Sequence, residues 1–158
     1  MINVYKLKIL KCPHKILQSK AQIVEKFDDQ LKKIIDRMFF LMKQNNGIGL
    51  AAPQIGIPLR LFVTEIPGEE KRVFINPSLA SPFGASKIEN EGCLSLPGYL
   101  YPVARPRIIT ISAYDVHGKE FNLFGWDISA RCWMHENDHL NGVLIKDICS
   151  GKPIKIKR

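Results

Sequence analysis

The sequence has 158 residues, of which 46% are hydrophobic and 24% are charged, a composition typical of one globular domain with its own core. It excludes a wholly disordered chain, a collagen and a coiled coil. No apolar run approaches the roughly 18 residues that a membrane-spanning helix needs. The 23 Lys and Arg residues outnumber the 15 Asp and Glu residues, giving a net charge of +8, which permits a polyanionic partner without requiring one.

The first residues lack the apolar core and the cleavage site of a secretory signal. We therefore expect a cytoplasmic protein, with an organelle as the alternative. In that setting the four cysteines are expected as thiols or metal ligands rather than as disulfides.

The predicted elements begin with an irregular, partly extended arm over residues 1–20, where apolar and basic side chains mix without a period. The clearest helical pattern covers residues 27–46, where apolar side chains recur every three or four positions. Asp28 or Asp29 can cap the start of this helix, and Asn-Asn-Gly at 45–47 ends it.

Extended segments follow this helix. Four strand candidates stand at residues 59–66, 72–75, 107–114 and 121–124, with turns expected at 67–68, 82–84, 97–98 and 117–118. A second helix is expected from its N-cap Asp127 to Asn141-Gly142, and a brief strand or packing segment at 143–145. The layout predicts an α+β fold with mainly antiparallel sheets.

The segment His135-Glu136-Asn137-Asp138-His139 lies in the second predicted helix. Positions i and i+4 share one helix face, so both imidazoles can bind one cation, and Glu136 can reach a water on that cation as a general base. The same residues could instead form a helix with two exposed histidines.

A catalytic metal site needs a third protein ligand, and the chain after His139 offers few. Gly142 fits one metallopeptidase pattern, but Ile145 stands where that pattern has its third histidine. Asp147 and Cys149 are the remaining downstream donors, so the search moves upstream.

Upstream, Cys93 follows a glycine, which lets the backbone approach a site closely. A thiolate is a strong ligand for zinc or ferrous iron. Cys93 could also be a small buried hydrophobe, and Cys132, three residues before His135, is a rival ligand.

Residues 47–54 (Gly-Ile-Gly-Leu-Ala-Ala-Pro-Gln) combine small side chains with Gln54, which offers a donor and an acceptor. They would let a substrate backbone approach. The segment lacks the Gly-Lys-Ser/Thr ending of a phosphate loop, and a tight packing turn is the other interpretation.

Together, residues 47–54, 91–95 (Glu-Gly-Cys-Leu-Ser) and 135–139 resemble, in order and separation, the three signature motifs of the peptide deformylases. The similarity extends over roughly residues 5–148. It implies a hydrolase, with antiparallel sheets packed around the metal-binding helix, that removes the formyl group from the N-formylmethionine of nascent polypeptides and releases formate. It also implies that Cys93, His135 and His139 bind one divalent ion, most often ferrous iron, with zinc, nickel or cobalt as alternatives.

The resemblance further implies roles around that ion. Glu136 accepts the proton of the attacking water and delivers it to the leaving amine. The Gln54 side chain and the Leu94 backbone N–H donate to the developing oxyanion. The substrate backbone lies along Ile48-Gly49 and Gly92 like an added strand. The methionine side chain is expected in an apolar pocket shared by Ile48, Leu50, Trp133 or its neighbours, His135 and residues 94–103.

Two features depart from the family pattern. Met134 stands where the family commonly has glutamine, a change that bears on pocket shape rather than on the ligands. Many bacterial members continue into a long C-terminal helix, whereas here a catalytic domain of residues 1–150 is expected to end in a short basic tail, 151–158. That tail could contact ribosomal RNA or be solvated and frayed. We also predict that Asp138 pairs with Arg105 and fixes the helix.

Two other functions stay open from the sequence. A metallopeptidase is disfavoured by the missing downstream ligand. A noncatalytic relative that binds peptide N-termini or RNA is disfavoured by Gln54, Cys93 and Glu136. The expected partners are formylmethionyl nascent peptides and, through the basic surface or tail, the ribosome; no membrane partner is expected.

Overall fold

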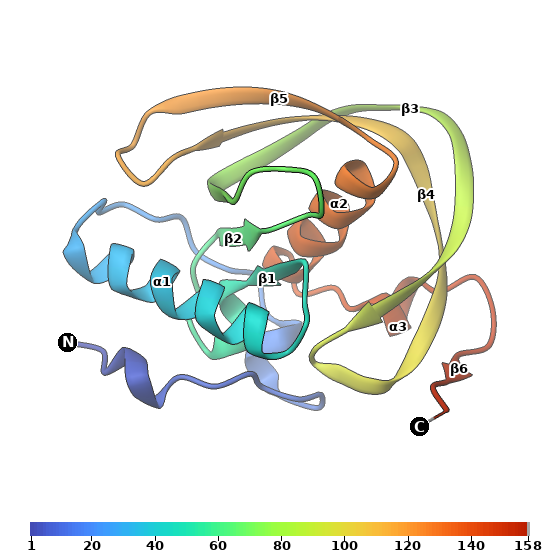
Figure 1. Cartoon of the computed structure of the whole chain (residues 1–158), viewed down its shortest axis with the longest axis horizontal. Coiled ribbons are helices and arrows are strands. Elements are labelled where there is room, and N and C mark those ends of the chain that lie inside the picture. Colours follow the sequence, from blue (N-terminus) through green and yellow to red (C-terminus); the bar gives the residue numbers. More distant parts are fainter. Residues whose placement is uncertain (158) are drawn as a thin grey trace.

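The computed structural model describes residues 1–157, except for the side chain of Ser81 (Figure 1). Its elements are α1 (Asp29–Gln44), β1 (Gly49–Ala51), β2 (Leu61–Thr64), β3 (Arg72–Cys93), β4 (Leu96–Tyr114), β5 (Glu120–Trp126), α2 (Ile128–Leu140), α3 (Ile145–Ile148) and β6 (Ile154–Lys155). Short 3-10 helices lie at Val4–Lys6, Lys15–Gln18 and Ala52–Ile55. None of the helices in the described part combines the length and apolar character that crossing a membrane requires.

Helix α1 forms where the periodic pattern predicts it. The Asp28 carboxylate accepts a hydrogen bond from the Leu31 N–H at 2.9 Å and so caps the first turn. The apolar face of α1 is buried and packs against β1 and β2 through Leu31, Ile34, Ile35, Met38, Leu41 and Met42.

The strands β1 to β5 follow chain order in one sheet, each antiparallel to the next, and β6 joins β4. Figure 1 shows β3, β4 and β5 arching over α2, which lies inside the curve. The predicted α+β class, with antiparallel strands around a central helix, is confirmed.

The third strand is much longer than the predicted 72–75, because Asn76-Pro77, which was expected to end it, and the expected turn at 82–84 are both irregularities inside β3. The register with β4 shifts on both sides of Phe83, and Gly84 has φ of 85°. A further shift occurs beside Asn76, which has φ of 49°. A bulge bends and twists a strand without ending it, so the β3–β4 ribbon can curl round α2.

The turn that joins β3 to β4 also differs from the prediction. Pro97-Gly98 lies inside β4, and the chain reverses at Leu94-Ser95, between the paired residues Cys93 and Leu96. The predicted strand 107–114 is therefore only the second half of β4.

Helix α2 begins one residue after Asp127, as predicted, but Asp127 makes no side-chain cap. Its carboxylate instead accepts from the Arg107 Nε at 3.0 Å. Trp133 packs α2 against β3 and β5. The centre of its ring lies 5.5 Å from that of Phe74, and the indole lies directly over Gly125, where a Cβ would collide with it.

Residues 143–145 form a packing segment rather than a strand, since Leu144 and Ile145 are buried and Ile145 opens α3. Of the two alternatives for the tail, fraying is wrong for residues 154–156, although these residues are exposed to solvent. Ile154 and Lys155 pair with β4, and the Ile156 N–H donates to the Gly98 carbonyl at 2.9 Å.

Candidate metal centre

Three potential ligands meet between the end of β3 and helix α2. β3 carries Cys93, and α2 carries His135 and His139 one turn apart. One ligand atom from each residue lies within 4.8 Å of those from the others, and the Cys93 Sγ is 3.5 Å from the His139 Nε2. The rival thiol, Cys132, is buried and lies outside this group of three.

The surroundings of these side chains suit a cation. Burial lowers the pKa of His139 well below its usual value, so its ring is neutral and has a lone pair to share. Burial also opposes protonation of His135, but hydrogen bonds with Cys93 and Glu91 outweigh it and raise the pKa of His135 to about 10. The position beside the thiol and the carboxylate thus favours positive charge. One thiolate and two imidazoles are a donor set of the borderline softness that zinc and ferrous iron accept.

Glu91 orients His135, a role that our sequence analysis did not assign. Its Oε1 accepts from the His135 Nδ1 at 2.8 Å, which leaves the Nε2 for a metal. Its carboxylate also accepts from Arg105 at 2.7 and 3.0 Å and from Arg131 at 2.6 Å. Burial works against the charged form, but the bonds from His135 and Arg105 prevail and lower the pKa of Glu91 to about 2.

Glu91 stands two positions before Cys93 in β3; both residues are buried and Gly92 between them is exposed. Because the register with β4 shifts between Glu91 and Cys93, regular strand alternation could not have identified Glu91 from the sequence. The predicted pairing of Arg105 with Asp138 is confirmed, at 2.9 Å. Arg105 therefore joins β3 to α2 through two carboxylates, one from each element.

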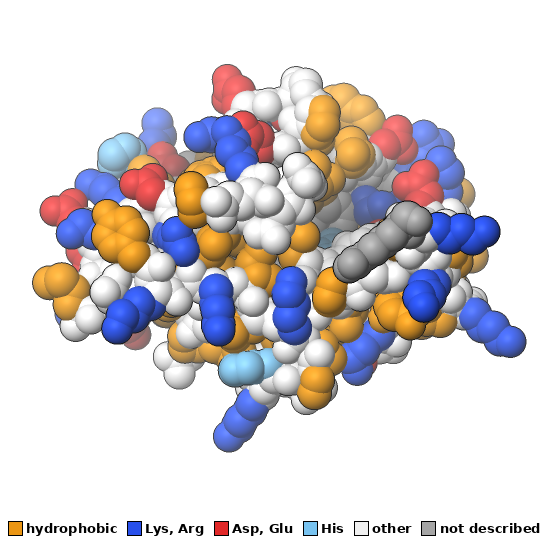
Figure 2. All heavy atoms as spheres, turned by 60° about the horizontal axis from the view of Figure 1, so that its bottom comes forward, with side chains coloured by type: hydrophobic (Ala, Val, Ile, Leu, Met, Phe, Trp, Pro, Cys, Tyr) orange, Lys and Arg blue, Asp and Glu red, His pale blue; other side chains and the backbone are white. Residues whose placement is uncertain are grey.

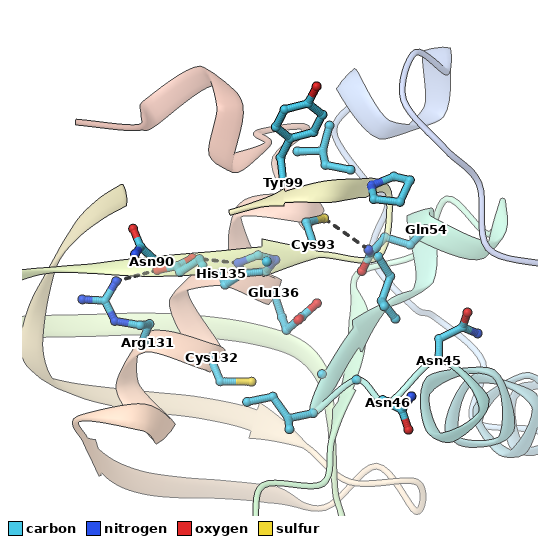
Figure 3. Close-up of a pocket in the computed structure, with 18 of the residues that line it drawn as sticks. Asn45, Asn46, Gln54, Asn90, Cys93, Tyr99, Arg131, Cys132, His135 and Glu136 are labelled. Atoms are coloured by element: carbon cyan, nitrogen blue, oxygen red, sulfur yellow. Dashed lines mark hydrogen bonds and ion pairs between the residues drawn. The ribbon is translucent and has the colours of Figure 1, made fainter. Parts of the chain in front are cut away.

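Glu136 lies near His135 and Cys93 in the pocket (Figure 3). The residue is 4% exposed, and its Oε2 has no hydrogen-bond partner among the described residues. Burial raises the pKa of Glu136 to about 7, and the neighbouring His135 only partly offsets this. A carboxyl group with such a pKa can both accept and release a proton near neutral pH.

Gly49 leaves the room that Glu136 occupies. A Cβ at this position would lie 2.5 Å from the Glu136 Oε1 and 3.0 Å from the Cys132 Sγ. No larger residue fits here unless α2 or the Glu136 carboxylate moves.

Gln54 faces the centre from the 3-10 helix Ala52–Ile55. The Ala51 N–H donates to its Oε1 at 3.0 Å, so the Nε2 points toward the Ser95 Oγ at 3.2 Å and the Cys93 Sγ at 3.7 Å (Figure 3). Leu94 lies in the β3–β4 turn directly after Cys93, and its carbonyl accepts from the Lys11 Nζ at 2.9 Å.

A pocket of about 590 Å³ opens onto the centre. Figure 2 shows the molecule hollowed on one face, with basic side chains near the hollow. Of the residues predicted to bind the metal, to catalyse or to hold the substrate backbone, all but His139 line this pocket: Ile48, Gly49, Gln54, Gly92, Cys93, Leu94, His135 and Glu136.

The expected pocket for an apolar side chain needs one correction. Leu50 and Trp133 do not line the cavity, because each is buried in a hydrophobic core, whereas Cys132, a neighbour of Trp133, does line it as the alternative allowed. Ile128, Arg131 and Cys132 line it instead, all from the first turns of α2.

Comparisons with known proteins agree with this geometry. The family model described as polypeptide deformylase matches residues 6–153. Peptide deformylase 1 of Clostridium perfringens is 45% identical over 84% of this chain and 90% of its own length. The peptide deformylase of Borreliella burgdorferi is 41% identical over 85% of this chain and 82% of its own length.

Solved structures give the same result. A Synechococcus elongatus peptide deformylase in complex with actinonin superposes with a TM-score of 0.89 at 37% identity, covering 93% of this chain and 80% of the other. The Thermotoga maritima peptide deformylase superposes with a TM-score of 0.88 at 36% identity, covering 92% of this chain and 98% of the other.

Proposed function

The chain belongs to the peptide deformylase family, and from this premise we propose which of its residues carry out the reaction. The protein is an enzyme that removes the formyl group from N-formylmethionyl peptides. One observation carries our assignment: Glu136 and the Cys93–His135–His139 group meet at one pocket.

The enzyme is metal-dependent, as its family is, and Cys93, His135 and His139 would hold the ion. We choose ferrous iron because the family resemblance implies it. One thiolate with two imidazoles suits zinc, nickel and cobalt equally, so the ligand set itself does not select the ion. When bound, such an ion supplies Lewis acidity and makes water a nucleophile near neutral pH.

Glu136 is assigned as the general base and acid. It takes a proton from the attacking water and gives it to the departing amine, for which its pKa near 7 is suited. The Gln54 Nε2 and the Leu94 N–H would donate to the formyl oxygen as negative charge develops there. The bond from the Ala51 N–H holds the Gln54 amide in the orientation that this role needs.

The substrate backbone is proposed to lie between β1 and the end of β3. β1 has only β2 as a strand neighbour in the described part of the chain, so its other edge can pair with an extended peptide. The Ile48 carbonyl accepts a hydrogen bond from the Glu65 N–H, on the side of β1 that faces β2. On the opposite side, Gly49 and Gly92 line the pocket and would face the peptide.

We place the reaction on nascent chains in the cytoplasm, where such substrates arise, and infer that the basic surface contributes to contact with the ribosome. The net charge of +8 supports this contact. Sedimentation with ribosomes at rising salt concentration would test it.

The central test measures formate release from formyl-Met-Ala-Ser by the metal-loaded enzyme and by Glu136→Gln. The variant should retain the ion and lose activity by a factor of about 10² to 10⁴, since a general base is removed. Glu89→Gln serves as the control, because this partly exposed carboxylate lines the same pocket and ligates nothing. A Glu136→Gln enzyme with more than a tenth of the wild-type rate would refute the assigned role.

A further inference from the structure

The C-terminal strand borders the pocket. Residues 154–155 pair with 99–100 of β4, and the Ile156 N–H donates to the Gly98 carbonyl at 2.9 Å. Figure 1 shows β6 at the outer side of β4. The same part of β4 forms one wall of the pocket, through Leu96, Pro97, Gly98 and Tyr99.

Ile156 itself lines the pocket, whereas Ile154 does not. The two side chains are otherwise closely matched, because Ile156 is 47% exposed and Ile154 is 48% exposed. They belong to the same short segment that pairs with β4: Ile154 lies opposite Leu100, and the Ile156 N–H donates to Gly98. They differ in that Ile156 reaches the cavity and Ile154 lies farther along β4.

The position of Ile156 places it beyond the reacting end of the substrate. The formyl group must reach Cys93 and Glu136, which are 9% and 4% exposed at the inner end of the pocket. An extended peptide advances about 3.3 Å per residue, so the second and third residues lie roughly 7–10 Å farther out. Tyr99 stands on that outer side of the pocket, above Cys93 in Figure 3, and is 42% exposed.

An exposed isoleucine at such a rim gains by contact with an apolar side chain, because both then leave water. We propose that Ile156 is a specificity-determining residue for the substrate positions after formylmethionine, where it favours an apolar side chain. This inference rests on the proposed function. It makes the C-terminal strand part of the substrate site.

The first test compares kcat/KM for formyl-Met-Ala-amide and formyl-Met-Ala-Leu-amide in wild type, Ile156→Ala and Ile154→Ala. Ile156→Ala should lose about half the free energy gained by burying an isoleucine side chain. Its kcat/KM on the longer peptide should therefore fall about five-fold, mainly through a higher KM. The shorter peptide should change less than two-fold, and Ile154→Ala should match wild type on both. An equal change on both peptides, or none, would overturn the inference.

A second variant separates substrate contact from support of the pocket wall. Ile156→Glu should reverse the preference, so that formyl-Met-Ala-Lys-amide becomes a better substrate than the leucine peptide. A weakened wall would slow both peptides alike and would refute the contact. If wild type releases no formate from any of these peptides, the proposed function itself fails, an outcome distinct from failure of the Ile156 contact.

Discussion

Replacing Glu91 by glutamine should destabilise the protein far more than a surface ion pair would suggest. The Glu91 and Arg105 side chains are each 6% exposed, and the carboxylate accepts from Arg105, Arg131 and His135. An amide would present its own N–H groups to these donors and leave Arg105 with only the half-buried Asp138 as counterion. Breaking a buried ion pair costs about 3–5 kcal/mol.

At about 2–4 °C per kcal/mol for a chain of this size, this loss corresponds to a fall in Tm of roughly 6–20 °C. Glu89→Gln is the matched control, because Glu89 stands two positions earlier in β3 and also forms ion pairs, with Lys87 and Arg131. Unlike that of Glu91, its side chain is 41% exposed. Exposed pairs contribute about 0–1 kcal/mol each, so losing both pairs should lower the Tm of this variant by at most ~8 °C.

Thermal unfolding followed by circular dichroism, with a chelator present, would measure the protein contacts alone. Repeating the scan with the ion should widen the gap, since a metal ligand that loses its orienting partner typically binds its ion 10–100-fold less tightly. Equal Tm values for the two variants in chelator would refute the view that Glu91 is the central anion of the site.

Three further predictions follow from local geometry. Gly49→Ala should fold but lose at least about 10²-fold in kcat in the formate assay, because its Cβ would displace the Glu136 carboxylate. Gly92→Ala is the comparison variant: its Cβ would meet only the Leu100 Cδ2, at 3.5 Å, so kcat should fall less than ten-fold. Asp28→Ala should lower stability by about 1 kcal/mol in urea unfolding with kcat unchanged, because the cap of α1 is remote from the pocket. Removal of the ion by a chelator should abolish formate release, and adding back ferrous iron without oxygen should restore it.

The sequence predicted the helices better than the strands because helical periodicity is local. The spacing of apolar side chains in α1 and the position of α2 could be read directly. Proline and glycine at 82–84 and 97–98 indicated turns, yet both sites lie within long strands. Whether such residues end a strand or bulge it depends on pairing with a partner strand, which no local pattern contains.

The same limit explains what was found and missed at the site. The spacing of the two histidines on α2 indicated a ligand pair, whereas Cys93, one of several candidate thiols, became the favoured third ligand only through its place in an ordered set of motifs. Glu91 and Arg131 were missed because their roles exist only after β3 has curled against α2. The contact of Ile156 with the pocket likewise depends on a strand pairing that the tail's composition does not reveal.

The metal centre depends on how the β3–β4 strand pair packs against α2. Cys93 at the end of β3 must stay close to two histidines on α2, although the sequence separation between Cys93 and His139 is 46 residues. Arg105 on β4 bonds Glu91 on β3 and Asp138 on α2, so it fixes the distance between the two ligand-bearing elements. A substitution at Arg105 should therefore weaken metal binding without touching a ligand, and Arg105→Lys, which cannot span both carboxylates with a planar fork, should not restore it.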